Sequence, residues 1–408
     1  MSRAAPRLVS IPPGAPFLRV LADRICSGDL VDGLRFRQGD PLSLARATVF
    51  VPTRRAARVL RSELTDRIGL GSAILPVIRP LGETDDDTGF FDPADPETLS
   101  LDPPIPQTAA MLRLADLVLA WKEALPRAVL DHLGGAPLVA PANPADAIWL
   151  GQSLFDLIQA VETEECDFSA LDTVMTEDLQ QWWQLTREFL TIARSYWPAL
   201  LQEISRTSPA RHHNAMLDVF TRALAENQHD RPVIVAGSAG TRPATARLIA
   251  RVAHMPKGAV VLPGLDHAMS QTHWIELARV AAATDAPQSP AAFDATVRSH
   301  PQYGLLRLVE SCGVGVQSFH DIPEIAELSA AMTVRRAAVS AALLPAGATE
   351  AWGQPGFLPD TDQLQTAFRQ VSLIEAANER EEAAALAAAM RLALEPEPAA
   401  PEPVVALV

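Results

Sequence analysis

Short apolar runs and helical patterns alternate in two separate blocks of the chain, and this order constrains the fold more than any other feature. In the first block, segments with the composition of buried strands are Leu8–Ile11, Thr48–Val51 and part of residues 73–83. The intervening patterns predict helices over Phe17–Cys26 and over residues 54–68. This β-α-β-α-β order indicates an open, parallel α/β sheet.

The second predicted helix begins just after Thr53, whose hydroxyl can cap it. The apolar residues expected on its buried face are Ala56, Val59, Leu60, Leu64 and Ile68.

A long helical block separates the two α/β blocks. Residues 84–107 are acidic and proline-rich, which is typical of a loop, and residues 108–227 have amphipathic helical patterns with no strand between them. Tryptophans in such a block are expected in its core, and they are Trp121, Trp149, Trp182, Trp183 and Trp197. Strand patterns return at Val233–Ala236 and in residues 257–266. The simplest interpretation is one α/β domain interrupted by an all-α insertion.

The C-terminal region has the pattern of a further unit. Residues 371–394 predict a strand followed by an alanine-rich helix, and the last five residues, 404–408, have the pattern of another strand. We expect these residues to begin a second α/β domain that is truncated here. The predicted boundaries are 1–104 and 229–300 for the two parts of the first domain, 105–228 for the insertion, 301–370 for a connecting region and 371–408 for the second domain.

Composition limits the partners that the chain can bind. Its net charge is −15, so contact with a polyanion requires a local basic patch. Lys122 and Lys257 are the only lysines among 34 basic residues, so the other 32 are arginines. No apolar run is long enough to span a membrane, and the three separated cysteines form no disulfide or metal pattern. A cytoplasmic location without a bound metal is expected.

The loop after the first strand has the layout of a phosphate-binding loop without its chemistry. A working loop needs backbone amides, a lysine and a Ser or Thr hydroxyl. Gly14, Ala15 and Pro16 occupy this place, and Pro12 and Pro13 before them lack amide protons. No GK[ST] sequence occurs in the chain. We therefore predict a strand-to-helix turn, with at most weak attraction of phosphate by the helix N-terminus.

A second candidate loop follows Val233–Ala236. Gly237 and Ser238 begin a Gly/Ser/Thr loop, residues 237–241, which precedes a helix and could form an anion nest. The strand ends without the acidic pair that would hold Mg²⁺ in a nucleoside triphosphatase. Asp266, after the next strand, is an isolated carboxylate for which we expect turn or capping chemistry.

The best local candidate for nucleic-acid contact is the start of the second predicted helix. Thr53, Arg54, Arg55 and Arg58 follow a strand C-terminus, where α/β folds bind ligands. Guanidinium groups and helix amides suit a phosphate backbone. The alternative is an ordinary solvated helix face. His212, His213 and His229 lack ligand spacing for a metal, and no catalytic constellation can be placed.

Several of these segments together resemble the N-terminal part of the AddB family in its alphaproteobacterial form. The segments are IPPGAPFLRVLADRI, VFVPTRRAARVL, ILPVIRPLGE, HPQYGLLRL and the long stretch that contains GSAGTRPAT. The resemblance runs in order along nearly all of the chain. AddB is the partner of AddA in an ATP-dependent helicase and exonuclease that processes DNA double-strand breaks for recombination.

The resemblance implies a superfamily 1 helicase-like body, similar to a P-loop NTPase, whose nucleotide site is degenerate at Gly14, Ala15, Pro16, Gly237 and Ser238. It places Thr53, Arg54 and Arg55 where such helicases touch single-stranded DNA. The family's C-terminal nuclease domain is missing from this sequence, and three scattered thiols cannot hold the iron–sulfur cluster of some relatives.

The resulting expectation is a DNA-engaging scaffold with no catalytic residue, cofactor or metal of its own. AddA would be its partner and would supply ATP and Mg²⁺ chemistry, while the missing nuclease domain would use Mg²⁺. Single-stranded DNA and duplex ends would be its nucleic-acid partners. Two alternatives stay open at this point. One is a Rossmann-like nucleotide-binding enzyme using Gly237–Thr241, and the other is an interaction module without DNA contact.

Overall fold

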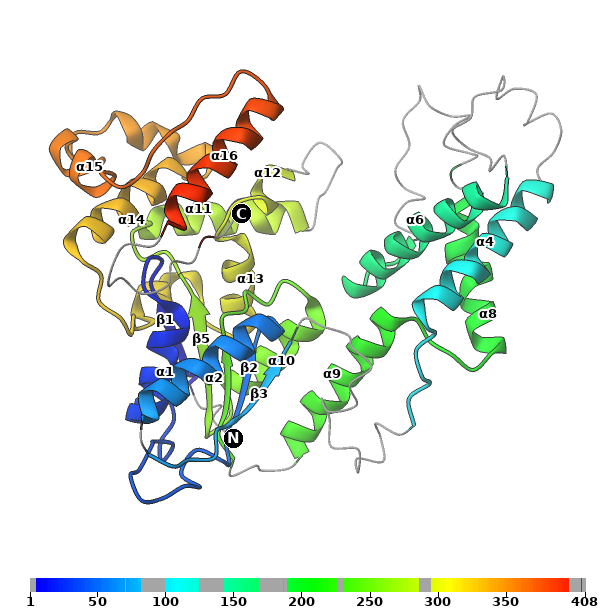
Figure 1. Cartoon of the computed structure of the whole chain (residues 1–408), viewed down its shortest axis with the longest axis horizontal. Helices are drawn as coiled ribbons and strands as arrows, with labels where there is room; N and C mark the ends of the chain where they lie inside the picture. The colour runs from blue at the N-terminus through cyan, green and yellow to red at the C-terminus, as the bar shows by residue number, and fades with distance from the viewer. Residues whose placement is uncertain are drawn as a thin grey trace. The chain divides into compact units, whose positions relative to one another are not determined.

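The computed structural model describes residues 5–69, 71–81, 100–124, 143–168, 186, 189–226, 231–285, 295–395 and 405. It contains a five-stranded, all-parallel sheet with the strand order β1-β5-β4-β2-β3 (Figure 1). The strands are β1 (Leu8–Ile11), β2 (Thr48–Val51), β3 (Val77–Pro80), β4 (Val233–Ala236) and β5 (Gly258–Pro263). Strands from both sides of the helical block share this sheet, so the predicted α/β class is confirmed.

The inner strands β2, β4 and β5 are buried on both faces, whereas Val77 of the edge strand β3 is 45 % exposed. Val49 and Val51 lie in the core on one face, whereas Phe50 and Val235 lie in the core on the other. The first core is completed by α1 (Phe17–Ser27) and α2 (Arg54–Ile68), and the second by α10 (Pro243–Ala253), α11 (Gln271–Asp285) and α13 (Tyr303–Ser311). Burial on both faces explains why these strands are continuous apolar runs rather than alternating ones.

Helix α2 begins as predicted but buries a slightly different face. The Thr53 hydroxyl oxygen accepts a hydrogen bond from the Ala56 amide at 3.1 Å, as the sequence suggested. The buried residues of α2 are Ala57, Leu60 and Leu64. Their i, i+3, i+7 spacing forms one narrow stripe. Val59 lies off this stripe and is 39 % exposed, so its predicted burial was wrong.

The helical block has a core of its own. Its elements are α4 (Gln107–Ala124), α6 (Pro144–Thr163), the π-helical turn η4 (Ile192–Tyr196), α8 (Trp197–Glu203) and α9 (Pro209–Glu226). Leu114, Phe155 and Trp197 share the insertion core, whereas Leu217 and Leu224 of α9 belong to the core of the sheet. Helix α9 therefore joins the insertion to the α/β body.

The tryptophan prediction was right for only part of the block. Trp197 is fully buried, as expected, and Trp121 is half-buried with its ring 5.1 Å from that of Phe189. Trp149 is 70 % exposed, so its predicted burial was wrong. It lies two positions before Gly151, whose backbone faces α4, and two positions along a helix turn the side chain to the far side. Trp182 and Trp183 lie outside the described residues.

A buried carboxylate ties α6 to the start of α9. Glu162 is buried, accepts a hydrogen bond from the Ser208 hydroxyl, and forms an ion pair with Arg211 at 2.7 Å. The Asn214 amide donates to the Glu162 carbonyl oxygen at 2.9 Å. Burial raises the pKa of the Glu162 carboxyl above its usual range, although Ser208 and Arg211 act in the opposite direction. The charged form is thus the less favourable one at this junction.

The raised pKa of Glu162 predicts that the free energy of unfolding depends on pH. Because the pKa of Glu162 is raised by folding, its contribution to stability is fully present at low pH. That contribution is lost as the pH rises past the range in which free glutamates titrate. Glu162→Gln keeps a neutral side chain, and we expect it to flatten the fall in urea midpoint between acidic and neutral pH. The exposed neighbour Glu164 provides the control, since Glu164→Gln should retain the wild-type slope. Identical slopes for all three proteins would contradict the prediction.

Arg247 of α10 adds a charged link between the insertion and the body. Its guanidinium donates two hydrogen bonds of 2.6 Å to Glu165, at the end of α6, and others to Asp218 of α9. One side chain therefore connects three helices, and its partly exposed position makes the link sensitive to salt.

The chain divides into two compact units, one of residues 1–327 with 343–349 and one of residues 328–342 with 350–408. The first unit also contains α12 (Ala295–Arg298) and the 3₁₀ turn η6 (Val316–Asp321), whose Phe319 packs in the sheet core. The second unit contains α14 (Ala330–Ala342), α15 (Thr361–Ala367) and α16 (Glu379–Ala393). The residues of the 3₁₀ segment η7 (Ala346–Gly353) are divided between the two units. None of the described helices has the length and apolar character to cross a lipid bilayer.

The strand predicted for residues 371–374 does not form. These residues belong to no strand, and Leu373 is 86 % exposed. An apolar segment becomes a strand only when a neighbour completes its hydrogen bonds, and no described strand lies beside it. The alanine-rich helix predicted after it is present as α16. The predicted terminal strand, residues 404–408, lies outside the described residues except for Val405, as does most of the predicted acidic loop.

Candidate functional site

The carboxyl ends of four strands meet at one edge of the sheet. Helices α1 and α2, which follow β1 and β2, pack on one face, whereas α10 and α11, which follow β4 and β5, pack on the other. The chain therefore turns in opposite directions after the neighbouring strands β1 and β5, and again after β4 and β2. Such switch points are where open α/β sheets form their ligand crevices.

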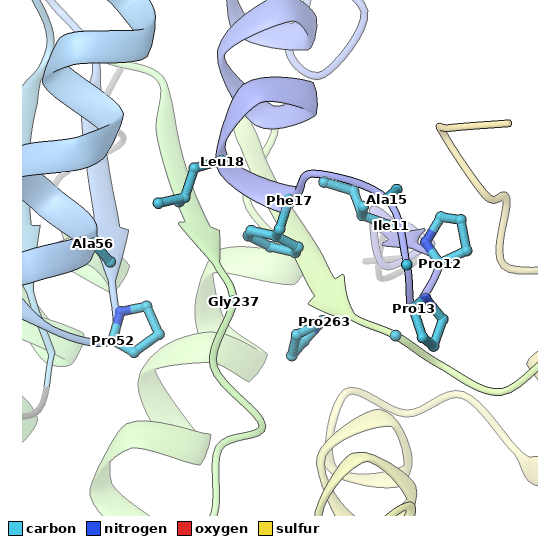
Figure 2. Close-up of a pocket in the computed structure, with 12 residues that line it drawn as sticks. Ile11, Pro12, Pro13, Ala15, Phe17, Leu18, Pro52, Ala56, Gly237 and Pro263 are labelled. Atoms are coloured by element: carbon cyan, nitrogen blue, oxygen red, sulfur yellow. The ribbon is translucent and has the colours of Figure 1, made fainter. Parts of the chain in front are cut away.

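A pocket of about 350 Å³ lies at this edge. Its lining contains only apolar residues, glycines and prolines: Ile11, Pro12, Pro13, Gly14, Ala15, Phe17, Leu18, Pro52, Ala56, Gly237, Pro263 and Gly264. Figure 2 shows the ring of Phe17 between Pro52 and Ala56 on one side and Pro12 and Pro13 on the other. No lining side chain carries a charge, a hydroxyl or an amide. The pocket therefore lies where open α/β sheets bind ligands, but it lacks the polar side chains that a nucleotide site needs.

The loop from Pro12 to Phe17 offers few donors to an anion. Its three prolines lack amide protons, and the Ala15 amide already donates to the Pro12 carbonyl oxygen at 3.2 Å. Helix α1 begins after Pro16, and no side chain caps its first turn. Gly14 and Ala15 line the pocket, but Pro16 does not. The observed turn matches the strand-to-helix turn that the sequence predicted.

Both glycine amides of the loop from Gly237 to Thr241 already donate hydrogen bonds within the protein. The Gly237 amide donates to the carbonyl oxygen of Val261 in β5 at 3.0 Å, and the Gly240 amide donates to the Ser238 hydroxyl at 3.2 Å. An anion nest needs such amides to converge on a ligand, and these two are already engaged. Gly237 reaches the pocket, whereas Ser238 is not among its lining residues.

Gly237 also sets how closely the two loops approach. Its φ of +79° is in the left-handed region, and a Cβ placed there would lie 3.2 Å from the Phe17 ring and 3.4 Å from Pro52. Only glycine meets both requirements without strain. The Phe17 ring therefore lies against the backbone at the end of β4, where a metal-binding carboxylate would be required in a phosphate-hydrolysing site.

Asp266 has the turn role that we expected. It is buried, and its Oδ1 accepts hydrogen bonds from the amides of Ala268 at 2.9 Å and Met269 at 3.3 Å. Its backbone carbonyl also accepts a bond from the Trp274 indole at 3.1 Å. This carboxylate stabilises the loop after β5.

The predicted DNA-contacting residues lie beside the pocket. Pro52 and Ala56, which line it, flank Thr53, Arg54 and Arg55 in the sequence. The Thr53 hydroxyl caps α2, and Arg54 is half-buried with a partner of its own. Arg55 and Arg58 are exposed. No ion pair or hydrogen bond involves either side chain among the described residues, so both guanidinium groups remain available to an anion.

Sequence inspection missed further exposed basic residues in this part of the chain. Exposed arginines without a carboxylate partner among the described residues also occur at Arg19, near the start of α1 at the same edge, and at Arg35, Arg37 and Arg46, in the connection that leads to the amino end of β2. The signal was present in the sequence. Residues 5–81 contain twelve arginines against six carboxylates, a net charge of +6 in a chain of net charge −15. A segment-by-segment charge count would have found it.

Among the described residues, the titratable groups away from the pocket form no reactive centre. Burial raises the pKa of the fully buried Cys312 thiol to about 11, so it is protonated and unreactive at neutral pH. Burial lowers the pKa of His213, which is therefore neutral. Within the described ranges, no group of His, Cys, Asp and Glu side chains could hold a metal ion, and His229 lies outside those ranges. A scan against protein-family models gives no match to this chain, and a search of curated proteins gives none either.

Proposed function

We propose that this chain is a DNA-engaging scaffold, similar to the N-terminal part of AddB, in an AddAB-type complex for double-strand break repair. In this proposal AddA supplies ATP-driven translocation, and this chain binds single-stranded DNA without hydrolysing ATP. Its helicase-like body would guide the strand in the cytoplasm, where the bacterial chromosome lies. The nuclease activity of such a complex would come from other domains.

The observation that carries the proposal is a contrast at one edge of the sheet. The pocket where an NTPase would bind phosphate has no polar side chain in its lining. Beside it, Arg55 and Arg58 at the start of α2 are exposed and unpaired among the described residues. This combination supports contact with phosphates outside the pocket and argues against nucleotide chemistry inside it.

Charge supports the same location. The acidic chain as a whole repels DNA, so binding depends on a local region where arginines outnumber carboxylates. Residues 5–81 are such a region, and within it Arg19 lies near the start of α1, at the same edge of the sheet as Arg55 and Arg58. Binding through exposed arginines releases counterions from DNA, and it must therefore weaken as salt rises.

The proposal predicts DNA binding without nucleotide binding. A fluorescein-labelled oligothymidylate should bind the full chain, with log affinity falling linearly against log salt concentration. Titration calorimetry with ATP and Mg²⁺, and with NAD, should give no binding heat. ATP hydrolysis by the purified chain would contradict the proposal. Binding of ATP or NAD without DNA would favour the Rossmann-like enzyme, and binding of none of these ligands would favour the interaction module.

A further inference from the structure

The pocket at the carboxyl edge has a chemistry that the DNA-binding proposal does not use. Its volume of about 350 Å³ is at the small end of ligand sites and suits one bulky group. Every lining side chain is apolar or absent. A polar ligand would lose its water there without gaining hydrogen bonds, whereas a hydrocarbon or an aromatic ring would gain from burial.

The backbone amides of three lining residues are also engaged already. The amides of Ala15, Gly237 and Gly264 donate to the carbonyl oxygens of Pro12, Val261 and Leu262 at 3.2, 3.0 and 3.2 Å. Pro12, Pro13, Pro52 and Pro263 have no amide proton to offer. A nucleobase in this pocket would leave its edge donors and acceptors unpaired, which is costly. The lining therefore favours an apolar side chain over a base.

The charges next to the pocket indicate what surrounds that apolar side chain. Arg19 follows Leu18, and Arg55 precedes Ala56, while Leu18 and Ala56 line the pocket. Both arginines are exposed and have no carboxylate partner among the described residues. Elsewhere in the described chain, arginines such as Arg279 and Arg307 are paired with carboxylates on their own helices. Unpaired guanidinium groups beside an apolar hollow complement a segment with negative charges around an apolar anchor.

We propose that this pocket is a docking site for an acidic peptide segment of a partner protein. One phenylalanine- or leucine-sized side chain of that segment fills the pocket, and neighbouring aspartates or glutamates pair with Arg19 and Arg55. The anchor supplies affinity through burial in a preformed hollow, and the ion pairs orient the segment.

The test uses the full chain and a fluorescein-labelled peptide of aspartate and glutamate with a single central phenylalanine. Anisotropy should show saturable binding that weakens roughly tenfold or more when the phenylalanine is replaced by serine, because burial of the ring is lost. This comparison changes only the peptide, so it does not depend on the folding of a variant. Equal binding of the two peptides would overturn the docking site.

A protein variant tests the pocket itself. Ala56→Leu adds a side chain that projects into the hollow from a half-buried helix position, and it should weaken the phenylalanine peptide roughly tenfold or more. Val59→Leu is the matched control, since Val59 is exposed on the same helix and does not line the pocket. Wild-type peptide affinity in Ala56→Leu would overturn the proposal.

Measuring the oligothymidylate affinity of the same variant distinguishes this inference from the proposed function. Ala56→Leu should leave oligothymidylate affinity unchanged, because the phosphates contact arginines outside the pocket. An equal loss of oligothymidylate affinity would show that the pocket holds a base, which would overturn the peptide site. Peptide binding that persists without any DNA binding would support the inference and contradict the proposed function.

Discussion

Gly258→Ala is expected to destabilise the chain by about 3 kcal/mol or more. Gly258 begins β5, directly after the turn that leaves α10. A Cβ at this position would overlap the carbonyl oxygen of Val252 and lie 2.9 Å from Cβ of Met255. The Val252 oxygen is helix backbone and cannot move away as a flexible side chain could. Either α10 or β5 must therefore shift, and both are central to the core of the sheet.

Urea unfolding followed by circular dichroism measures this effect as a fall in midpoint. Gly353→Ala is the matched control, because a Cβ at Gly353 meets nothing within 4 Å. That variant should stay within about 0.5 kcal/mol of the wild type. A Gly258→Ala midpoint equal to that of the control would mean that β5 does not approach α10 as closely as the structure has it.

The double variant Arg55→Glu, Arg58→Glu is expected to lower single-strand affinity by roughly tenfold or more at low salt. It removes two guanidinium groups that the proposed function assigns to phosphates and replaces them with repelling carboxylates. The slope of log affinity against log salt should fall by about 0.7 for each phosphate contact that is lost. Fluorescence anisotropy with oligothymidylate over a salt series measures both quantities.

The control for this variant must change the total charge equally. Arg113→Glu with Arg380→Glu does so, because both residues are exposed and lie on α4 and α16 rather than on α2. We expect it to keep nearly the wild-type affinity and slope. Equal losses in the two double variants would point to a non-specific charge effect and would remove α2 from the DNA path.

The sheet strands could be predicted because their amino-acid composition reflects their burial. A strand buried on both faces must be apolar throughout, and Val233–Ala236 shows this in four residues. The cap at Thr53 was equally local, since it joins residues three positions apart. Such features depend on neighbours along the chain and are visible without the fold.

Burial of individual helix residues could not be predicted in the same way. Val59 and Trp149 are apolar residues on amphipathic helices, yet both are exposed. Their burial depends on which side of the helix the rest of the protein covers, and one position along a helix changes the direction by about 100°. The segment 371–374 is the extreme case, because its apolar residues form no strand and Val371, Leu373 and Ile374 are exposed.

At the candidate site, too, some features follow from the sequence and others only from the tertiary structure. The sequence alone determined what the loops at this edge lack, since folding cannot change the prolines at 12, 13 and 16 or add a lysine to residues 12–17 or 237–241. It also determined the excess of arginine in residues 5–81. Only the tertiary structure decided that loops more than 200 residues apart, at Pro12–Phe17 and Gly237, form one apolar pocket. Amides such as that of Gly237 find their partners on other strands, so whether they remain free for a ligand is a property of the sheet and not of the loop sequence.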